Sequence, residues 1–224
     1  MRNFSLPFVL VSLFLAACAQ QPSPQGNALS AAAGADTSAA GLQPRKSGLD
    51  QVSAVFAFDL SGASVYVAPV QIDYTKRFSA PATLRARDYE LDQKDRQKLD
   101  EVMAQTFSEK FLAPRGSQLA ASPANADYTM KLSLENFSLA APLEPSGWLW
   151  RVYTEQSAYG VLVGTLYDRN GNAVMRFRDR RDFGDTFGTL SGPGRFERFT
   201  SVTFWADMRV DLRRAFSSLD RSLR

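Results

Sequence analysis

The sequence predicts an α+β fold, a two-layer sandwich in which a mixed sheet of about four to five strands carries two helices on one face. Three observations indicate it: two stretches with apolar residues at helical spacing, one stretch of strict alternation, and an Asn-Gly turn between two β-rich runs. The order along the chain is strand, helix, strand, hairpin, helix. The first two strands are therefore expected to be parallel, joined by a crossover, and the hairpin to add antiparallel strands.

The strands are placed by their local patterns. Residues 65–72 are rich in β-branched side chains but contain Pro69, which has no amide donor, so this strand lies at an edge or breaks at the proline. Residues 128–135 alternate apolar and polar side chains, and the strand continues unevenly to Leu139. Residues 161–167 begin the hairpin. If Asn170 and Gly171 form a two-residue turn, Gly164 faces Phe177.

The two helices are placed by apolar spacing. Asp92 is expected to cap the first helix, which ends at Pro114 and Gly116, and its apolar face comprises Leu99, Val102, Met103, Phe107 and Phe111. The closing helix has its apolar face at Phe204, Trp205, Met208, Leu212, Ala215, Phe216 and Leu219. Its charged residues are expected to face away from the core, namely Asp207, Arg209, Asp211, Arg213, Arg214 and Asp220.

The composition excludes several kinds of chemistry. The chain has one cysteine and no histidine, so Ser-His-Asp and Cys-His catalysis and the usual zinc sites are excluded, and no cofactor or metal site is expected. Carboxylate-only chemistry stays open, most plausibly on glycan. The net charge of +3 is small for 224 residues, so no nucleic-acid partner is expected.

The N-terminus carries a targeting pattern. Arg2 is followed by an apolar run over residues 4–15, too short to span a bilayer, as in a secretory signal. Residues 15–18, Leu-Ala-Ala-Cys, resemble the lipobox of bacterial lipoprotein precursors. That resemblance implies cleavage before Cys18, a diacylglycerol thioether on its sulfur and an acylated N-terminus. Ala19, rather than aspartate, resembles lipoproteins that are sorted to the outer membrane.

The domain organisation follows from this pattern. Residues 1–17 are expected to be the lipoprotein signal peptide, and residues 18–48 the lipidated cysteine with a disordered tether of low hydrophobicity. A flexible tether of about 30 residues has an r.m.s. reach of roughly 30 Å. Residues 49–224 are expected to be a single α+β domain in the periplasm.

Two surface features leave alternatives open. The connection over residues 142–157 contains Trp148, Trp150 and Tyr153, which either cover the core or form a contact surface for an envelope protein. An arginine stripe at Arg176, Arg178 and Arg180 is either a solvated strand face or a contact for anionic lipid or acidic glycan.

Several segments together resemble a family. They are residues 59–61, 65–70, 126–128, 166–173, 179–181 and 205–209, and the match spans about residues 55–222. The chain resembles a family of uncharacterised proteobacterial lipoproteins with an α+β periplasmic domain. The resemblance implies an envelope lipoprotein and assigns no functional residue beyond the lipidated cysteine.

The expected function is therefore a non-enzymatic lipoprotein, anchored to the outer membrane through lipid on Cys18, whose periplasmic domain acts by binding. One alternative is a scaffold or accessory subunit of a cell-envelope complex. A carboxylate-based enzyme that acts on envelope glycan is the other.

Overall fold

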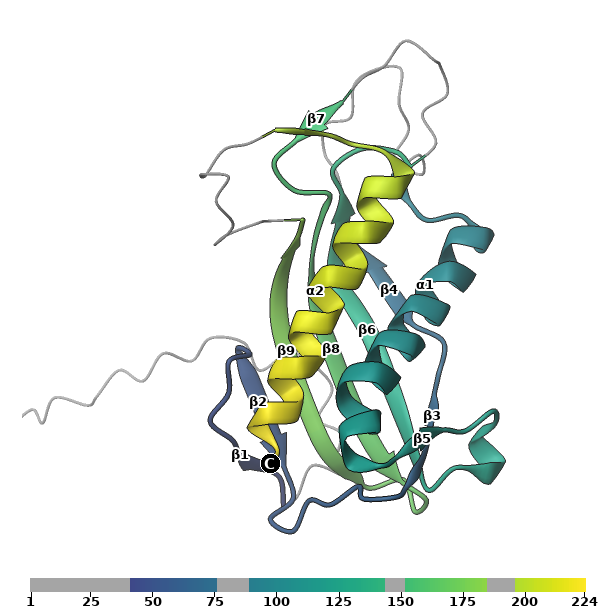
Figure 1. The fold of residues 1–224 in the computed structure, drawn as a ribbon, viewed down its shortest axis with the longest axis vertical. Coiled ribbons are helices and arrows are strands. Elements are labelled where there is room, and N and C mark those ends of the chain that lie inside the picture. Colours follow the sequence, from purple (N-terminus) through teal and green to yellow (C-terminus); the bar gives the residue numbers. More distant parts are fainter. Residues whose placement is uncertain (1–40, 76–88, 144–151, 185–195) are drawn as a thin grey trace, which may run out of the picture. The chain divides into compact units, whose positions relative to one another are not determined.

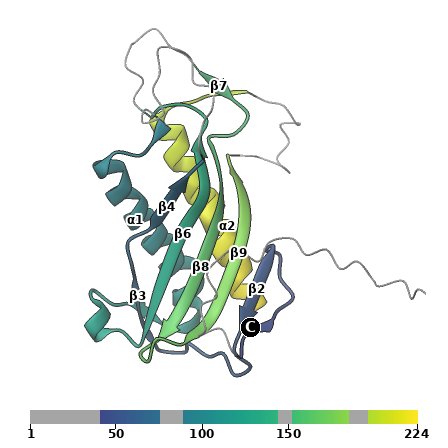
Figure 2. The ribbon, with the colours of Figure 1, turned by 180° about the vertical axis from the view of Figure 1, so that it is seen from behind.

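The computed structural model describes residues 41–75, 89–143, 152–184 and 196–224, all within one compact unit. Two helices lie over one face of a large mixed sheet (Figure 1), and the other face of the sheet carries no helix of the described chain (Figure 2). The predicted α+β class and the placement of both helices on one face are confirmed. No helix among the described residues is both long and apolar enough to cross a bilayer.

The sheet has eight strands among the described residues, in the order β1-β2-β9-β8-β6-β3-β5, with β4 also paired to β6. Their bounds are β1 Gln43–Pro44, β2 Gln51–Ala54, β3 Ser64–Val67, β4 Gln71–Tyr74, β5 Gln118–Leu119, β6 Tyr128–Leu139, β8 Ala158–Asp168 and β9 Ala173–Phe183. A separate ribbon pairs β7 (Tyr153–Thr154) with β10 (Glu197–Arg198).

The expected four to five strands were too few. The additional strands are two to four residues long, which is too short to show a period-two pattern. One of them, β1, lies inside residues 18–48, the range that the sequence assigned to the tether. It is held to the domain by Arg45, whose amide donates to the Val52 carbonyl and whose guanidinium donates to the Val55 carbonyl.

Of the two alternatives for residues 65–72, an edge strand or a break at Pro69, the structure shows the break. Strands β3 and β4 lie on either side of it and both pair parallel with β6. The amide of Val70, next to the proline, donates instead to Asp100 Oδ1 on α1 at 2.7 Å. The helix thus supplies the acceptor that the sheet cannot offer at the break.

The long strand β6 continues unevenly, as expected, because it contains a bulge between Glu135 and Ser138. Asn136, within the bulge, has φ of 50°. The extra residue restores the inward direction of Phe137, which is fully buried.

The hairpin has the expected register, with Gly164 opposite Phe177, but a different turn. The amide of Gly171 donates to the Asp168 carbonyl and the amide of Asp168 to the Asn172 carbonyl, with Gly171 at φ of 81°. This is a three-residue loop with a glycine bulge. A register shift between Leu166 and Tyr167 compensates for the longer loop. The pairing of Gly164 with Phe177 is therefore the one expected for a two-residue turn.

Helix α1 (Gln93–Phe107) begins where expected, since the Asp92 side chain accepts from the Asp95 amide. It continues through a π-helical turn, η3 (Ser108–Leu112), and a short 3₁₀ turn, η4 (Ala113–Arg115), to Gly116 at φ of 67°. Helix α2 (Ser201–Ser222) begins at a capping box formed by Thr200 and Thr203. The apolar residues expected on both helices are buried.

One expectation for α2 was wrong. Asp211 and Asp220 do not face away from the core, since each is only 5% exposed. Asp211 accepts from the amide of Gly184 at the end of β9, and Asp220 pairs with Arg115 and Arg224. Burial of these carboxylates is possible because each has charged or amide donors next to it.

Candidate functional site

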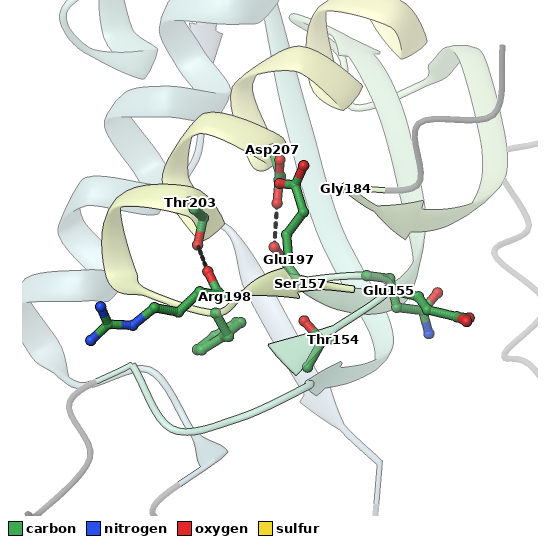
Figure 3. A pocket seen from close by; sticks show the side chains of 10 residues that line it. Thr154, Glu155, Ser157, Gly184, Glu197, Arg198, Thr203 and Asp207 are labelled. Carbon is green, nitrogen blue, oxygen red and sulfur yellow. Dashed lines mark hydrogen bonds between the residues drawn. The ribbon is translucent and has the colours of Figure 1, made fainter. Parts of the chain in front are cut away.

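A polar pocket lies between the β7–β10 ribbon and the first turns of α2 (Figure 3). Three other segments reach it: the residues just before β8, the end of β9 and the residue after β10. Its polar side chains are those of Thr154, Glu155, Gln156, Ser157, Glu197, Arg198, Thr203 and Asp207.

Asp207 is the central side chain of the pocket. It extends from α2 and accepts a short hydrogen bond from the hydroxyl of Ser157. Gly184 passes close by, where a Cβ would lie 2.6 Å from Asp207 Oδ2, and its φ of +88° is left-handed. Only glycine meets both conditions without strain. Its amide donates to Asp211 Oδ2 at 2.9 Å, one helical turn further along α2.

Two neighbouring carboxyl groups of α2, Asp207 in the pocket and Asp211 one turn further along, have pKa values shifted in the same direction. Burial raises the pKa of Asp207, and the neighbouring carboxylates of Asp211 and Glu197 raise it further, while the Ser157 hydroxyl lowers it. Burial also raises the pKa of Asp211. The Gly184 amide and the guanidinium groups of Arg214 and Arg181 lower it, but by less. Protonation of Asp207 and Asp211 thus becomes easier than for a carboxyl in water.

The size of the pocket limits what it holds. Its cavity measures about 20 Å³. One water molecule needs roughly 10–15 Å³, whereas small-molecule sites typically enclose about 300–1,000 Å³. The pocket therefore has room for a water-sized occupant beside Asp207, and a sugar ring does not fit there.

Within the described ranges, no three acidic, histidine or cysteine side chains converge closely enough to hold a metal ion. Asp207 of the pocket and its neighbour Asp211 have partners within the domain instead. Asp207 accepts from Ser157, and Asp211 accepts from Gly184 and pairs with Arg214 at 3.3 Å. Their geometry is that of a buried polar network that joins α2 to the sheet.

Among the residues that the sequence singled out, Cys18, Trp148 and Trp150 lie outside the described residues. Tyr153 is described, on β7 opposite Arg198 of β10, and it is 54% exposed. Phe196, before β10, and Val202, in the first turn of α2, are also exposed, at 61% and 78%. These three side chains are named the apolar end group below. The structure does not bring Tyr153 over the core.

The arginine stripe of β9 lies on the sheet face opposite the helices. Two of its arginines contact side chains of neighbouring strands. Arg178 pairs with Glu135 of β6 at 2.5 Å, and Arg180 lies over the ring of Tyr159 of β8. These contacts support the interpretation of a solvated strand face.

The sequence reasoning missed Ser157, Glu197 and the inward direction of Asp207 and Asp211. A signal for Asp211 was present, because it follows Met208 by three positions and precedes Ala215 by four. The apolar spacing therefore passes through it. Ser157 and Glu197 belong to loop ends that meet only in three dimensions, and no local pattern marks them.

No protein-family model matches the chain, and no curated protein matches it in sequence. Solved structures with a similar arrangement are bacterial. The PelC dodecamer from Paraburkholderia phytofirmans is 15% identical at a TM-score of 0.39, over 77% of this chain and 98% of that one. The DUF330-family protein XCC0632 from Xanthomonas campestris is 13% identical at 0.37, over 74% and 85%.

A third neighbour is a neuraminyllactose-binding hemagglutinin homolog from Helicobacter pylori, 9% identical at a TM-score of 0.40, over 75% and 91% of the two chains. The neighbours thus include a member of an uncharacterised bacterial family. All of these likenesses are distant in sequence and in structure. The resemblance to proteobacterial lipoproteins stays a prediction.

Proposed function

We propose that the protein is an envelope lipoprotein, anchored to the outer membrane by lipid on Cys18, whose periplasmic domain acts by binding and not by catalysis. The observation that carries the anchor is the Leu-Ala-Ala-Cys sequence at residues 15–18 directly after a short apolar run. The absence of a second cysteine leaves Cys18 as the single thiol available for that modification.

The buried polar network supports binding over turnover. Asp207 and Glu197 are the carboxyl pair that a glycan hydrolase at this site would use, since such enzymes need two carboxyl groups about 5–9.5 Å apart with a sugar between them. A cavity of about 20 Å³ leaves no room for that sugar. The hydrolase alternative is therefore less well supported at this pocket.

Mass spectrometry of the mature protein from membranes tests the anchor. We expect a chain that begins at Cys18 and carries the mass of a diacylglycerol and an acyl group, in the outer-membrane fraction. The Cys18→Ser variant is expected to keep residues 1–17 and to lose the lipid mass. An unmodified Cys18 in the wild-type chain contradicts the proposal.

A role as scaffold or accessory subunit of an envelope complex is the second candidate, and the apolar end group favours it. Tyr153, Phe196 and Val202 expose large apolar side chains within or next to one short ribbon, whereas most such side chains of the domain are buried. Exposed aromatic residues of this kind are typical of protein contact surfaces.

Site-specific photo-crosslinking in intact cells tests this candidate. A photoreactive phenylalanine analogue at position 153 or 196 is expected to give a defined crosslinked band. The matched control is position 56, since Phe56 is 80% exposed but lies just after β2, away from the ribbon in sequence and sheet order. Equal bands from all three positions, or none from 153 and 196, would contradict a partner at the apolar end group.

A further inference from the structure

Helix α2 separates its charges by sign. Its acidic residues Asp211 and Asp220 are buried, and Asp207 is partly buried in the polar pocket. Its arginines are exposed, namely Arg209, Arg213, Arg214 and Arg221. The outer face of the helix is therefore cationic, although the helix as a whole contains acids and bases in similar numbers.

The cationic face forms one wall of a groove. Lys110 of η3 lines it together with Val210, Arg213, Arg214, Ser218 and Arg221 of α2. The groove is shallow and open to solvent, with a volume of about 530 Å³. Val210 is 45% exposed and adds an apolar contact beside the charges. This feature is named the α2 groove below.

The groove keeps an excess of positive charge. Glu109 pairs with Arg213 at 3.1 Å, and both side chains are well exposed; Asp211 pairs with Arg214 at 3.3 Å. Within the described part of the chain, Lys110 and Arg221 make no ion pair with a carboxylate. The Glu109–Arg213 pair is exposed on both sides, and such surface ion pairs contribute at most about 1 kcal/mol, so an incoming anion can replace this one. The helix dipole favours a positive charge in the last turn of a helix, which accounts for Arg221 but not for the other basic residues of the groove.

The N-terminal chain joins the domain beside this groove. Ser47 Oγ lies 2.7 Å from Ser222 Oγ of α2, and a Cβ on Gly48 would lie 3.7 Å from Ser218 Oγ. Ser218 itself lines the groove. The segment that connects Cys18 to the domain therefore arrives at the cationic end of α2.

We propose that the α2 groove docks on the phosphate-bearing headgroups of anionic lipids in the membrane that holds the protein. The proposal rests on the lipid anchor at Cys18. The sequence predicts a flexible tether after Cys18, and a reach of roughly 30 Å would keep the groove close to the headgroups. Each basic residue near an anionic surface gains about fivefold in partitioning, and the exposed apolar side chain of Val210 fits the headgroup boundary. An acidic protein would also attract this positive charge, but the proposed lipid anchor holds the groove next to the membrane and not next to such a protein.

Vesicle co-sedimentation tests the proposal with the unlipidated chain from Ala19 to Arg224. This chain keeps every core residue of the described ranges, which extend from Leu49 to Leu219. We expect it to bind vesicles with 30% phosphatidylglycerol in phosphatidylcholine, to release them at high salt, and to ignore pure phosphatidylcholine. The variant Lys110→Gln/Arg213→Gln/Arg221→Gln is expected to lose roughly 100-fold in partitioning.

The matched control removes three charges elsewhere, Lys131→Gln/Arg169→Gln/Arg180→Gln, and is expected to bind as the wild-type chain does. An equal loss in this control overturns the proposal in favour of net charge alone. Equal binding of the wild-type chain to neutral vesicles also overturns the proposal. So does binding to polyglutamate, a model of an acidic protein, in the absence of binding to vesicles. Self-association that only the groove variant loses would assign the groove to a second copy of the chain.

The test separates the groove from the anchor. A lipidated Cys18 with no loss in the groove variant removes the groove proposal and leaves the anchor. An unmodified Cys18 with the expected loss removes the anchor and leaves a lipid-binding groove.

Discussion

Gly164 lies at a point in the central hairpin where an aromatic ring crosses from the neighbouring strand. Phe177 is its partner on β9, and a Cβ on Gly164 would overlap that ring and lie 3.0 Å from Leu132 Cδ2 on β6. Phe177 is fully buried under α2, where its ring meets that of Phe216 edge to face at 6.3 Å. The absent side chain therefore makes room for the contact between sheet and helix.

We predict that Gly164→Ala destabilises the domain by about 1–3 kcal/mol, because the methyl group displaces a packed ring. Urea denaturation followed by tryptophan fluorescence measures the change. Gly48→Ala is the control, since the nearest atom to its Cβ lies at 3.7 Å, and it should leave the free energy of unfolding within about 0.5 kcal/mol. A stable Gly164→Ala with an unstable Gly48→Ala would contradict the packing described for Phe177.

Two groups of aspartates respond to pH in opposite ways. Burial raises the pKa of Asp179, as it does for Asp207 and Asp211 of α2. Hydrogen bonds lower the pKa of Asp59, Asp127 and Asp168: Ser61 donates to the first, Ser64 to the second and Asn172 to the third. The first group binds protons more readily in the folded state than in the unfolded state, and the second less readily.

The raised group predicts a stability that increases as pH falls from 7 to about 4, since its contribution is complete below the unfolded pKa and is lost as pH rises through the folded one. The lowered group loses its contribution only below about pH 4. Unfolding free energies at several pH values measure both. Asp207→Asn/Asp211→Asn should flatten the rise between pH 7 and 4, and Asp59→Asn should leave it unchanged; a profile that falls throughout this window contradicts the prediction.

At the scale of elements, the break between β3 and β4 shows how a helix completes a sheet. Pro69 prevents a continuous strand, and the free amide of Val70 points to α1, where Asp100 accepts it at 2.7 Å. The amide of Leu91, just before α1, donates to the hydroxyl of Tyr74 on β4. Two hydrogen bonds therefore connect α1 and the residue before it to the two ends of β4.

We predict that Asp100→Ala costs about 1–3 kcal/mol of stability, because the half-buried Val70 amide is left without its acceptor. Asp100→Asn keeps an oxygen at the same place and should cost less than about 1 kcal/mol. Glu101→Ala removes a neighbouring exposed carboxylate of the same helix and serves as the control. Thermal unfolding of the three variants ranks them, and an equal loss in Asp100→Asn would show that the charge matters more than the hydrogen bond.

The long elements were predictable because repeated spacing marks them. The five apolar positions from Leu99 to Phe111 and the alternation from Tyr128 define α1 and β6, and both match the structure. The short strands β2 and β5 were not predictable, since pairing with distant partners creates them, and β1 forms only on the edge that β2 offers. The hairpin register was right although the turn was not, because a bulge restored it.

The candidate site was harder to predict than the fold. Ser157 and Asp207 are fifty positions apart, and only the packing of α2 on the sheet brings them together. The charges of Asp211 and Asp220 predict an outward position, whereas both side chains are buried. Each has a donor from a distant segment, Gly184 for the first and Arg115 for the second, and no pattern along α2 announces those donors.

At the scale of the whole molecule, the core of the described residues spans most of the domain. Its buried members begin at Leu49 and end at Leu219, and the sequence before Gly41 is poor in large apolar side chains after residue 18. We predict that chains beginning at residue 19 and at residue 41 unfold at the same temperature to within about 2 °C. Differential scanning calorimetry compares them. A lower midpoint for the shorter chain would show that residues 19–40 contribute to folding.

The contact between Ser47 and Ser222 has a mechanical consequence. It joins the start of the domain to the last turn of α2 across 175 positions of sequence. Tension on a membrane anchor enters through β1 and β2, and β2 is bound to the remaining sheet by four residue pairs with β9. In the described sheet, β6 and β8 pair with neither β1 nor β2, and β9 meets the load through those four residue pairs. Under a pull through the proposed anchor, we expect these few pairs to break before the helix-covered part of the sheet opens.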